Sequence, residues 1–274
     1  MGWLQAGAPS DRQRCDEDGT RAGARHLLAV PSDVLSADQS GTPALSISTL
    51  PGAHVGFRIW DCGLATLRHL WERERAAPGW ARGLRVLELV RCSKMPLARA
   101  VSLETSTQTV CAAQGCGTGL VGLGLWLLGA DVTLTDQPNI LPLTKHNVGE
   151  TLLRAGNRGA ERLRVLEYMW GTDLAPLAPP FDLVLASDVA YDHRAVSPLV
   201  STLESVLDAP AGAASSVLLA YRCSDVLTPE TLKAERKFFA RLGGAFGVSE
   251  VQSSIEHVQL YSLVGRKGAG EGVG

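Results

Sequence analysis

The sequence has no CxxC pair, and its cysteines and histidines never cluster at the spacing of metal ligands. Its six cysteines are spread along 274 residues, which indicates reduced thiols rather than a framework of disulfides. We therefore expect no metal site. The same pattern predicts a protein of the cytoplasm, with the nucleus as a second compartment.

Long runs of positive charge are also absent. The formal net charge is -2 and the pI is about 6.3, so we expect no surface for nucleic acid. The N-terminus lacks the apolar core of a signal peptide. The most apolar long stretch, residues 119–132, is rich in glycine and too short to span a bilayer, so we expect no membrane contact. A hydrophobic fraction of 45% and a charged fraction of 20% are typical of a soluble globular protein.

No internal repeat divides the chain. Residues 1–40 are rich in Ala, Gly, Ser, Asp and Arg without periodicity, which predicts a poorly ordered N-terminal extension. Residues 268–274 predict a flexible tail by the same argument. The remaining residues, 41–267, have a length that suits one α/β domain.

Helical and strand patterns alternate between residues 61 and 264. This alternation predicts an α/β fold, with a mostly parallel sheet covered by helices on both faces. The last two strands are separated by about five residues, too few for a parallel crossover, so they should form an antiparallel hairpin. Asp61 is a candidate N-cap for the first helix. The expected helices are 61–76, 119–129, 141–154, 196–207 and 229–242, and the expected strands are 84–89, 131–135, 163–166, 181–186, 215–220, 247–251 and 257–264.

Three alternating glycines, Gly115, Gly117 and Gly119, stand before the second expected helix. Glycines let the backbone turn sharply and approach a ligand closely, and the helix N-terminus adds free N–H groups. Alone, this pattern is also typical of a glycine-rich turn, and with Gly122 it matches the dinucleotide fingerprint. The next strand ends at Asp136, which alone could be a turn residue or a cap. The loop and the carboxylate together favour a cofactor that contains adenosine.

Several stretches make a closer resemblance. IWDCGLATLRHL, VLEL, GCGTGLVGLGLWLLGADVTLTDQP, the Trp170-Gly171 pair and FDLVLASDVAYDH follow one another in the order of the family-16 "methyltransferase-like" protein-lysine methyltransferases. The similarity covers residues 55–265. It implies a Rossmann-like seven-strand methyltransferase sheet and S-adenosyl-L-methionine as the cofactor. It also implies a protein lysine as the acceptor, and we expect the enzyme to act as a monomer.

The resemblance also implies the cofactor-binding residues. Asp136 would hold the ribose hydroxyls, and Glu88 would stand beside the cofactor at the mouth of its strand. Trp60 would line the methionine end and Trp170 would pack near the adenine, although both are more often core aromatics. The remaining cofactor contacts implied are Gly115, Cys116, Gly117, Gly119 and Ser187.

The D-x-x-Y motif from Asp188 to Tyr191 corresponds to the part of the family that faces the substrate lysine. Methyl transfer needs a neutral amine aligned with the methyl group and shielded from water. Asp188 would bind the incoming ammonium, and Tyr191 would border the lysine channel with its hydroxyl or its aromatic face. Without the resemblance, Asp188 would be taken for a helix cap and Tyr191 for a core residue.

The chain departs from the family between Leu89 and Gly115. Residues 90–114, 25 in number, interrupt a motif that otherwise runs directly from strand to glycine loop. In one arrangement the insertion loops out and residues 84–89 remain the central strand. In the other, residues 109–113 replace that strand, and Ala113 takes the position of Glu88. Backbone geometry is most constrained at the junction between strand and loop, so either arrangement could weaken cofactor binding. We therefore expect reduced or absent activity.

Three alternatives to a lysine methyltransferase stay open. The acceptor could be an arginine, a histidine or a small molecule. The fold could be an inactive binding module, which the insertion favours. A nicotinamide-dependent oxidoreductase would share the glycine pattern, but the D-x-x-Y motif and the antiparallel hairpin argue against it.

Overall fold

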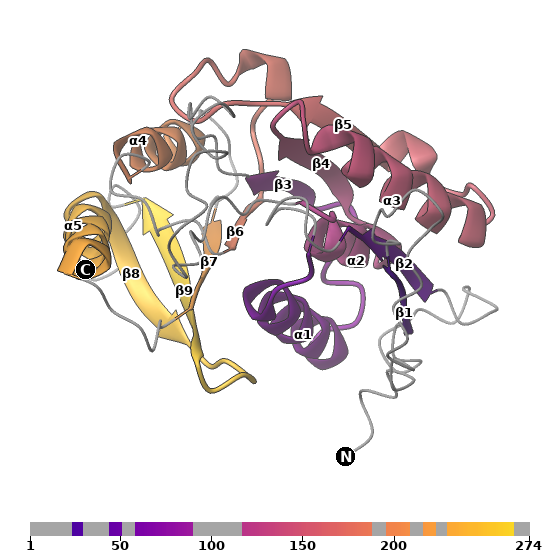
Figure 1. The fold of residues 1–274 in the computed structure, drawn as a ribbon, viewed down its shortest axis with the longest axis horizontal. Helices are drawn as coiled ribbons and strands as arrows, with labels where there is room; N and C mark the ends of the chain where they lie inside the picture. Colours follow the sequence, from indigo (N-terminus) through magenta and orange to yellow (C-terminus); the bar gives the residue numbers. More distant parts are fainter. Residues whose placement is uncertain are drawn as a thin grey trace, which may run out of the picture.

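The computed structural model describes residues 24–29, 44–50, 58–89, 117–187, 196–208, 216–222 and 229–265 (Figure 1). The insertion, the tail at 268–274 and most of the extension at 1–40 lie outside the described residues. The predicted domain boundaries therefore stay predictions.

A seven-stranded sheet organises the described part of the chain, in the order β5-β4-β3-β6-β7-β9-β8. Neighbours from β5 to β7 are parallel, whereas β9 is antiparallel to both β7 and β8. The predicted sheet class and the C-terminal hairpin are both confirmed. The strands are β3 (Arg85–Leu89), β4 (Asp131–Asp136), β5 (Leu163–Glu167), β6 (Leu183–Ser187), β7 (Ser216–Arg222), β8 (Phe246–Val251) and β9 (Val258–Gly265).

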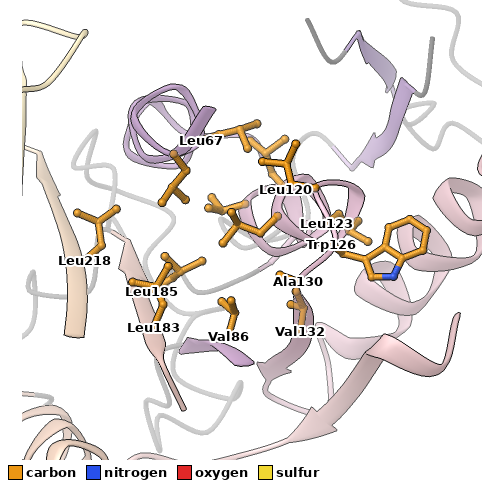
Figure 2. Close-up of a cluster of buried hydrophobic side chains, with 14 of the residues drawn as sticks. Leu67, Val86, Leu120, Leu123, Trp126, Ala130, Val132, Leu183, Leu185 and Leu218 are labelled. Atoms are coloured by element: carbon orange, nitrogen blue, oxygen red, sulfur yellow. The ribbon is translucent and has the colours of Figure 1, made fainter. Parts of the chain in front are cut away.

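Both faces of the sheet are buried because each central strand carries apolar side chains in both directions. In β6, Leu183 and Leu185 join the core beneath the first helices, while Val184 and Ala186 join the core on the opposite side. Figure 2 shows Leu183, Leu185 and neighbouring strand residues directed toward the helices that carry Leu67 and Leu120. The sheet is thus the middle layer between two apolar cores.

The helices agree closely with the sequence pattern, and α3 and α4 have the expected bounds. The first core contains residues of α1 and α2, and the second contains residues of α4 and α5. Asp61 is not the N-cap of α1, because Trp60 occupies that position. The Asp61 carboxylate instead meets His257 Nε2 at 2.8 Å. The helices are α1 (Asp61–Ala76), α2 (Leu120–Leu127), α3 (Leu141–Arg154), α4 (Val196–Leu207) and α5 (Pro229–Ala245).

A second, two-stranded antiparallel sheet was not predicted. It pairs β1 (Ala24–Ala29) with β2 (Ala44–Thr49). Strand β1 therefore lies within the segment that the sequence predicted to be poorly ordered. Leu45 and Ile47 of β2 are fully buried in the first core, and β2 packs along α3. The pair is consequently attached to the main domain through β2.

Strand β3 is an interior strand of the large sheet, between β4 and β6, despite the insertion that follows it in the sequence. Val86 pairs with Val132 of β4 on one side and with Leu183 of β6 on the other. This agrees with the arrangement in which residues 84–89 remain the central strand. Residues 109–113, the alternative strand, lie outside the described residues.

The close packing of α2 on the sheet depends on Gly122. A Cβ added there would collide with the Leu134 side chain and would lie 2.7 Å from Glu88 Oε2 and 2.9 Å from Val132 Cγ1. We expect Gly122→Ala to lower the free energy of unfolding by about 1–3 kcal/mol, measured by urea denaturation.

Gly149→Ala in α3 is the matched control, because a Cβ there would meet no atom within 4 Å. It should raise the free energy of unfolding by about 0.5–1 kcal/mol. Equal effects from the two substitutions would contradict this account of α2.

Candidate functional site

The carboxyl ends of β3 and β6 form the point where the strand order reverses. After β3 the chain builds outward through β4 and β5, then returns with β6 on the other side of β3. In open parallel sheets, ligands bind outside the carboxyl ends of strands at this kind of position. Asp136 and Ser187 end β4 and β6, and Glu88 lies one residue before the end of β3. The sheet topology therefore gathers these three predicted residues at one edge.

The glycine loop turns into α2 at this edge. Gly117 and Gly119 have φ values of 44° and 76°, in the left-handed region where glycine is favoured. Gly119 is the N-cap of α2, and its carbonyl accepts the hydrogen bond from Leu123 N at 3.0 Å. The backbone N–H groups at the start of α2 therefore follow directly after the glycine loop, at this edge of the sheet.

Asp136 is almost completely buried and is bonded to the loop. Its Oδ2 accepts a hydrogen bond from Gly117 N at 3.0 Å, and its Oδ1 accepts one from Gln137 N at 2.7 Å. Two backbone donors therefore hold the carboxylate in place beside the loop.

Glu88 is the second buried carboxylate. Its Oε2 accepts a hydrogen bond from Gly122 N at 2.9 Å, and its carbonyl accepts one from Thr135 Oγ1 at 2.8 Å. Burial raises the pKa of Glu88 from 4.5 to about 7; the bond from Gly122 opposes this rise, and the negative charge of Asp136 adds to it. A nearby cation would offset the cost of ionising this group.

Ser187 contacts α1 at the end of β6, and Trp60 is the N-cap of the same helix. Thr66 Oγ1 donates to Cys62 O at 2.8 Å and lies 3.4 Å from Ser187 Oγ. Because Thr66 has a single hydroxyl hydrogen, Ser187 must be the donor in the second contact. Trp60, half-buried, begins α1, and its carbonyl accepts from Leu64 N at 3.1 Å.

Trp170 packs in the other core. It lies 5% exposed in the cluster that contains Leu87 and Leu89, on the side of β3 opposite to Glu88. Its Nε1 has no hydrogen-bond partner among the described residues. Since a buried indole N–H usually finds an acceptor, this group is one that a bound ligand could satisfy.

Four predicted residues, Gly115, Cys116, Asp188 and Tyr191, lie outside the described residues. Within the ranges that the structure describes, no three His, Cys, Asp or Glu side chains are grouped to hold a metal ion. Among the described helices, none has the length and apolarity needed to cross a membrane.

Sequence reasoning missed the contribution of α3 to the loop. Thr144 Oγ1 donates to Gly117 O at 2.7 Å, and Asn147 Nδ2 donates to Thr118 O at 2.9 Å. Both side chains are fully buried. The available signal was a pair of polar residues three apart on a helix, where they share one face.

The model of a family described as "Lysine methyltransferase" matches residues 39–245 of the chain. This range contains β2 and the described strands through β7, with the glycine loop and Asp136 among them.

Curated relatives carry the same description in their names. The chain is similar to protein N-lysine methyltransferase METTL21A of Danio rerio, 31% identical over 156 residues, covering 56% of this chain and 65% of that protein. METTL21A of Mus musculus is 40% identical over 90 residues, 32% of this chain and 40% of that protein. EEF1A lysine methyltransferase 3 of Mus musculus is 30% identical over 161 residues, 58% of this chain and 55% of that protein. The matches thus span less than two thirds of each relative.

Among solved structures, the chain is similar to a magnesium protoporphyrin IX methyltransferase of Synechocystis PCC 6803 with bound SAH. The TM-score is 0.45 with 18% identity, covering 74% of this chain and 83% of that chain. A likeness of this size adds nothing to the argument about function.

The raised pKa of Glu88 predicts a pH-dependent stability. Between pH 4.5 and about 7 the folded chain keeps a proton that the unfolded chain has lost, so the free energy of unfolding falls as pH rises through this window. Glu88→Gln keeps a carbonyl oxygen for the bond from Gly122 and cannot ionise. The variant should therefore lose this part of the pH dependence, on the order of 3 kcal/mol.

Urea denaturation at about pH 4.5 and about pH 8 measures the difference. Glu204→Gln, at an exposed position of α4, is the control and should keep the pH dependence of the unaltered chain. Parallel curves for Glu88→Gln and the unaltered chain would contradict the assignment.

Proposed function

Since the chain belongs to the lysine methyltransferase family, we propose that it transfers a methyl group from S-adenosylmethionine to a lysine side chain of a protein. The single observation that carries the proposal is the family match across residues 39–245. The left-handed glycine loop bonded to the buried Asp136 supports it, because that geometry suits an adenosine-containing ligand.

The described residues fit this cofactor. Asp136 would accept hydrogen bonds from the ribose hydroxyls, and Gly117 and Gly119 would let the backbone approach the ligand. Glu88, a buried carboxylate, would face the positively charged methionine end, which Trp60 would line. Trp170 would pack near the adenine, and its Nε1 would find there the acceptor that it lacks among the described residues.

The remaining cofactor contacts are proposed from the sequence and the fold together. Gly115 and Cys116 precede Gly117 in the chain and would complete the wrap around the methionine and ribose. Ser187 ends β6 beside Thr66 of α1, and its hydroxyl would contact the cofactor.

When bound, S-adenosylmethionine supplies a methyl group on a positively charged sulfur that a neutral amine attacks in line. Asp188, the residue directly after β6, would bind the lysine ammonium and align its nitrogen. Tyr191 would border the channel and exclude water. Asp188 would hold the lysine while its ammonium loses a proton to solvent, and the neutral nitrogen would then take the methyl group as the thioether S-adenosylhomocysteine leaves. The protein residues therefore act mainly by orientation.

We place the reaction in the cytoplasm, with the nucleus as a second compartment, and expect a monomer that meets its protein substrate transiently. The scattered cysteines support the compartment, because they indicate reduced thiols.

A second candidate is an inactive methyltransferase fold that serves as a binding module. The insertion at residues 90–114 favours this candidate, because it interrupts the connection between β3 and the glycine loop. The two candidates differ in whether labelled methyl groups reach protein.

Incubating the chain with methyl-labelled S-adenosylmethionine and cell extract tests the proposed function. We expect label on protein lysines, located by mass spectrometry. Asp188→Ala should reduce incorporation roughly a hundredfold, the size of effect expected for a group that handles the reacting amine. Its affinity for the cofactor should not change.

Asp208→Ala, an exposed aspartate after α4, is the matched control and should label protein as the unaltered chain does. The chain lacking residues 90–114 serves as the second enzyme in the same assay. If neither chain labels any protein, the binding module is favoured and the enzyme proposal fails.

Deleting residues 90–114 should strengthen cofactor binding. In the deletion variant the strand is joined directly to the loop, so the entropy of closing a 25-residue insertion no longer opposes the approach to Gly117. We expect the full chain to bind S-adenosylmethionine at least about tenfold more weakly than the deletion variant, as measured by titration calorimetry. Equal micromolar affinities would show that the insertion does not impair the site.

A further inference from the structure

Helix α3 carries a buried polar stripe. Thr144, Asn147 and Thr151 are each 0% exposed, and their spacing places them on one face of the helix. Buried polar side chains are almost always hydrogen-bonded. The three side chains of the stripe are hydrogen-bonded to two separate segments of the chain, the glycine loop and β2.

The ends of the stripe contact different segments. Thr144 Oγ1 donates to Gly117 O of the glycine loop at 2.7 Å. Thr151 Oγ1 lies 3.4 Å from Ser46 N and 3.5 Å from Ser46 O, in the middle of β2.

Asn147, between them, bonds to both segments. Its Nδ2 donates to Thr118 O of the loop at 2.9 Å and to Ser48 O of β2 at 3.2 Å. Its Oδ1 accepts from Ser48 N at 2.8 Å. Both amide hydrogens and the amide oxygen are thus engaged, and the edge of β2 that faces away from β1 is closed by a side chain of α3.

We propose that Asn147 is a positioning residue that couples the β1–β2 pair to the glycine loop, so that cofactor binding at the loop and closure of the β2 edge strengthen each other. The identity of the ligand rests on the proposed function. The coupling follows from the bonds themselves, because a loop fixed by a ligand fixes Thr118 O and, through Asn147, Ser48. Such coupling is reciprocal.

This role matters more in this chain because residues 90–114 separate the loop from β3. The strand no longer leads straight into Gly117. Side-chain contacts from Asp136, Thr144 and Asn147 hold the loop instead. Asn147 therefore influences both the position of the glycine loop and how firmly β2 is held.

Residue-resolved amide hydrogen exchange on the full chain without ligand is the first test. Thr144→Val should speed exchange of the Gly117 amide alone, and Thr151→Val that of the Ser46 amide alone. Asn147→Leu, of similar size, should speed both amides by about tenfold, although neither amide bonds to Asn147. Faster exchange at only one of them in Asn147→Leu would overturn the coupling.

The second test adds S-adenosylhomocysteine to the same proteins. In the unaltered chain it should slow exchange at Ser46 as well as at Gly117, and in Asn147→Leu it should slow Gly117 only. Equal protection of Ser46 in both proteins would also overturn the proposal. If no ligand binds while the ligand-free pattern holds, the proposed function fails, and only the link between the β2 edge and the glycine loop through Asn147 stands.

Discussion

The buried hydrogen bond from the Gly117 amide to the Asp136 carboxylate ties the glycine loop to the end of β4. It is 3.0 Å long and joins the two sequence features that pointed to a cofactor. Just after Gly117 in the chain, Gly119 is the N-cap of α2. Helix α2 packs on the sheet closely enough for the Gly122 amide to donate a hydrogen bond to Glu88. The geometry of the site thus follows from one contact between a loop and a strand end.

The electrostatics of the site follow from the same arrangement. Glu88 and Asp136 lie on the side of the sheet that α2 covers, and the charge of Asp136 helps raise the pKa of Glu88. Keeping two buried carboxylates ionised costs free energy unless a cation or hydrogen-bond donors offset that cost. In the proposed function, the positively charged methionine end of the cofactor would provide that charge, which gives a physical reason for an acidic pair in this position.

Strong local periodicity made most of the large sheet and its helices predictable, including the bounds of α3 and α4. Capping was less predictable: Asp61 pairs with His257 of β9, a partner that no local pattern could indicate. The β1–β2 pair was missed for a similar reason. The edge of β2 that faces away from β1 is hydrogen-bonded by Asn147, which is far away in the sequence, so no local pattern indicated the strand. At the site, Glu88 and Asp136 lie near the carboxyl ends of the strands where the sequence placed them, and the roles of all the predicted site residues stay predictions.

A crystal structure of the chain with S-adenosylhomocysteine would locate the cofactor relative to the two carboxylates. We expect the ribose hydroxyls within hydrogen-bond distance of the Asp136 carboxylate, with the methionine end beside Glu88 and the carboxyl ends of β3 and β6. A ligand bound elsewhere, or a ligand in this crevice whose ribose makes no contact with Asp136, would contradict this expectation.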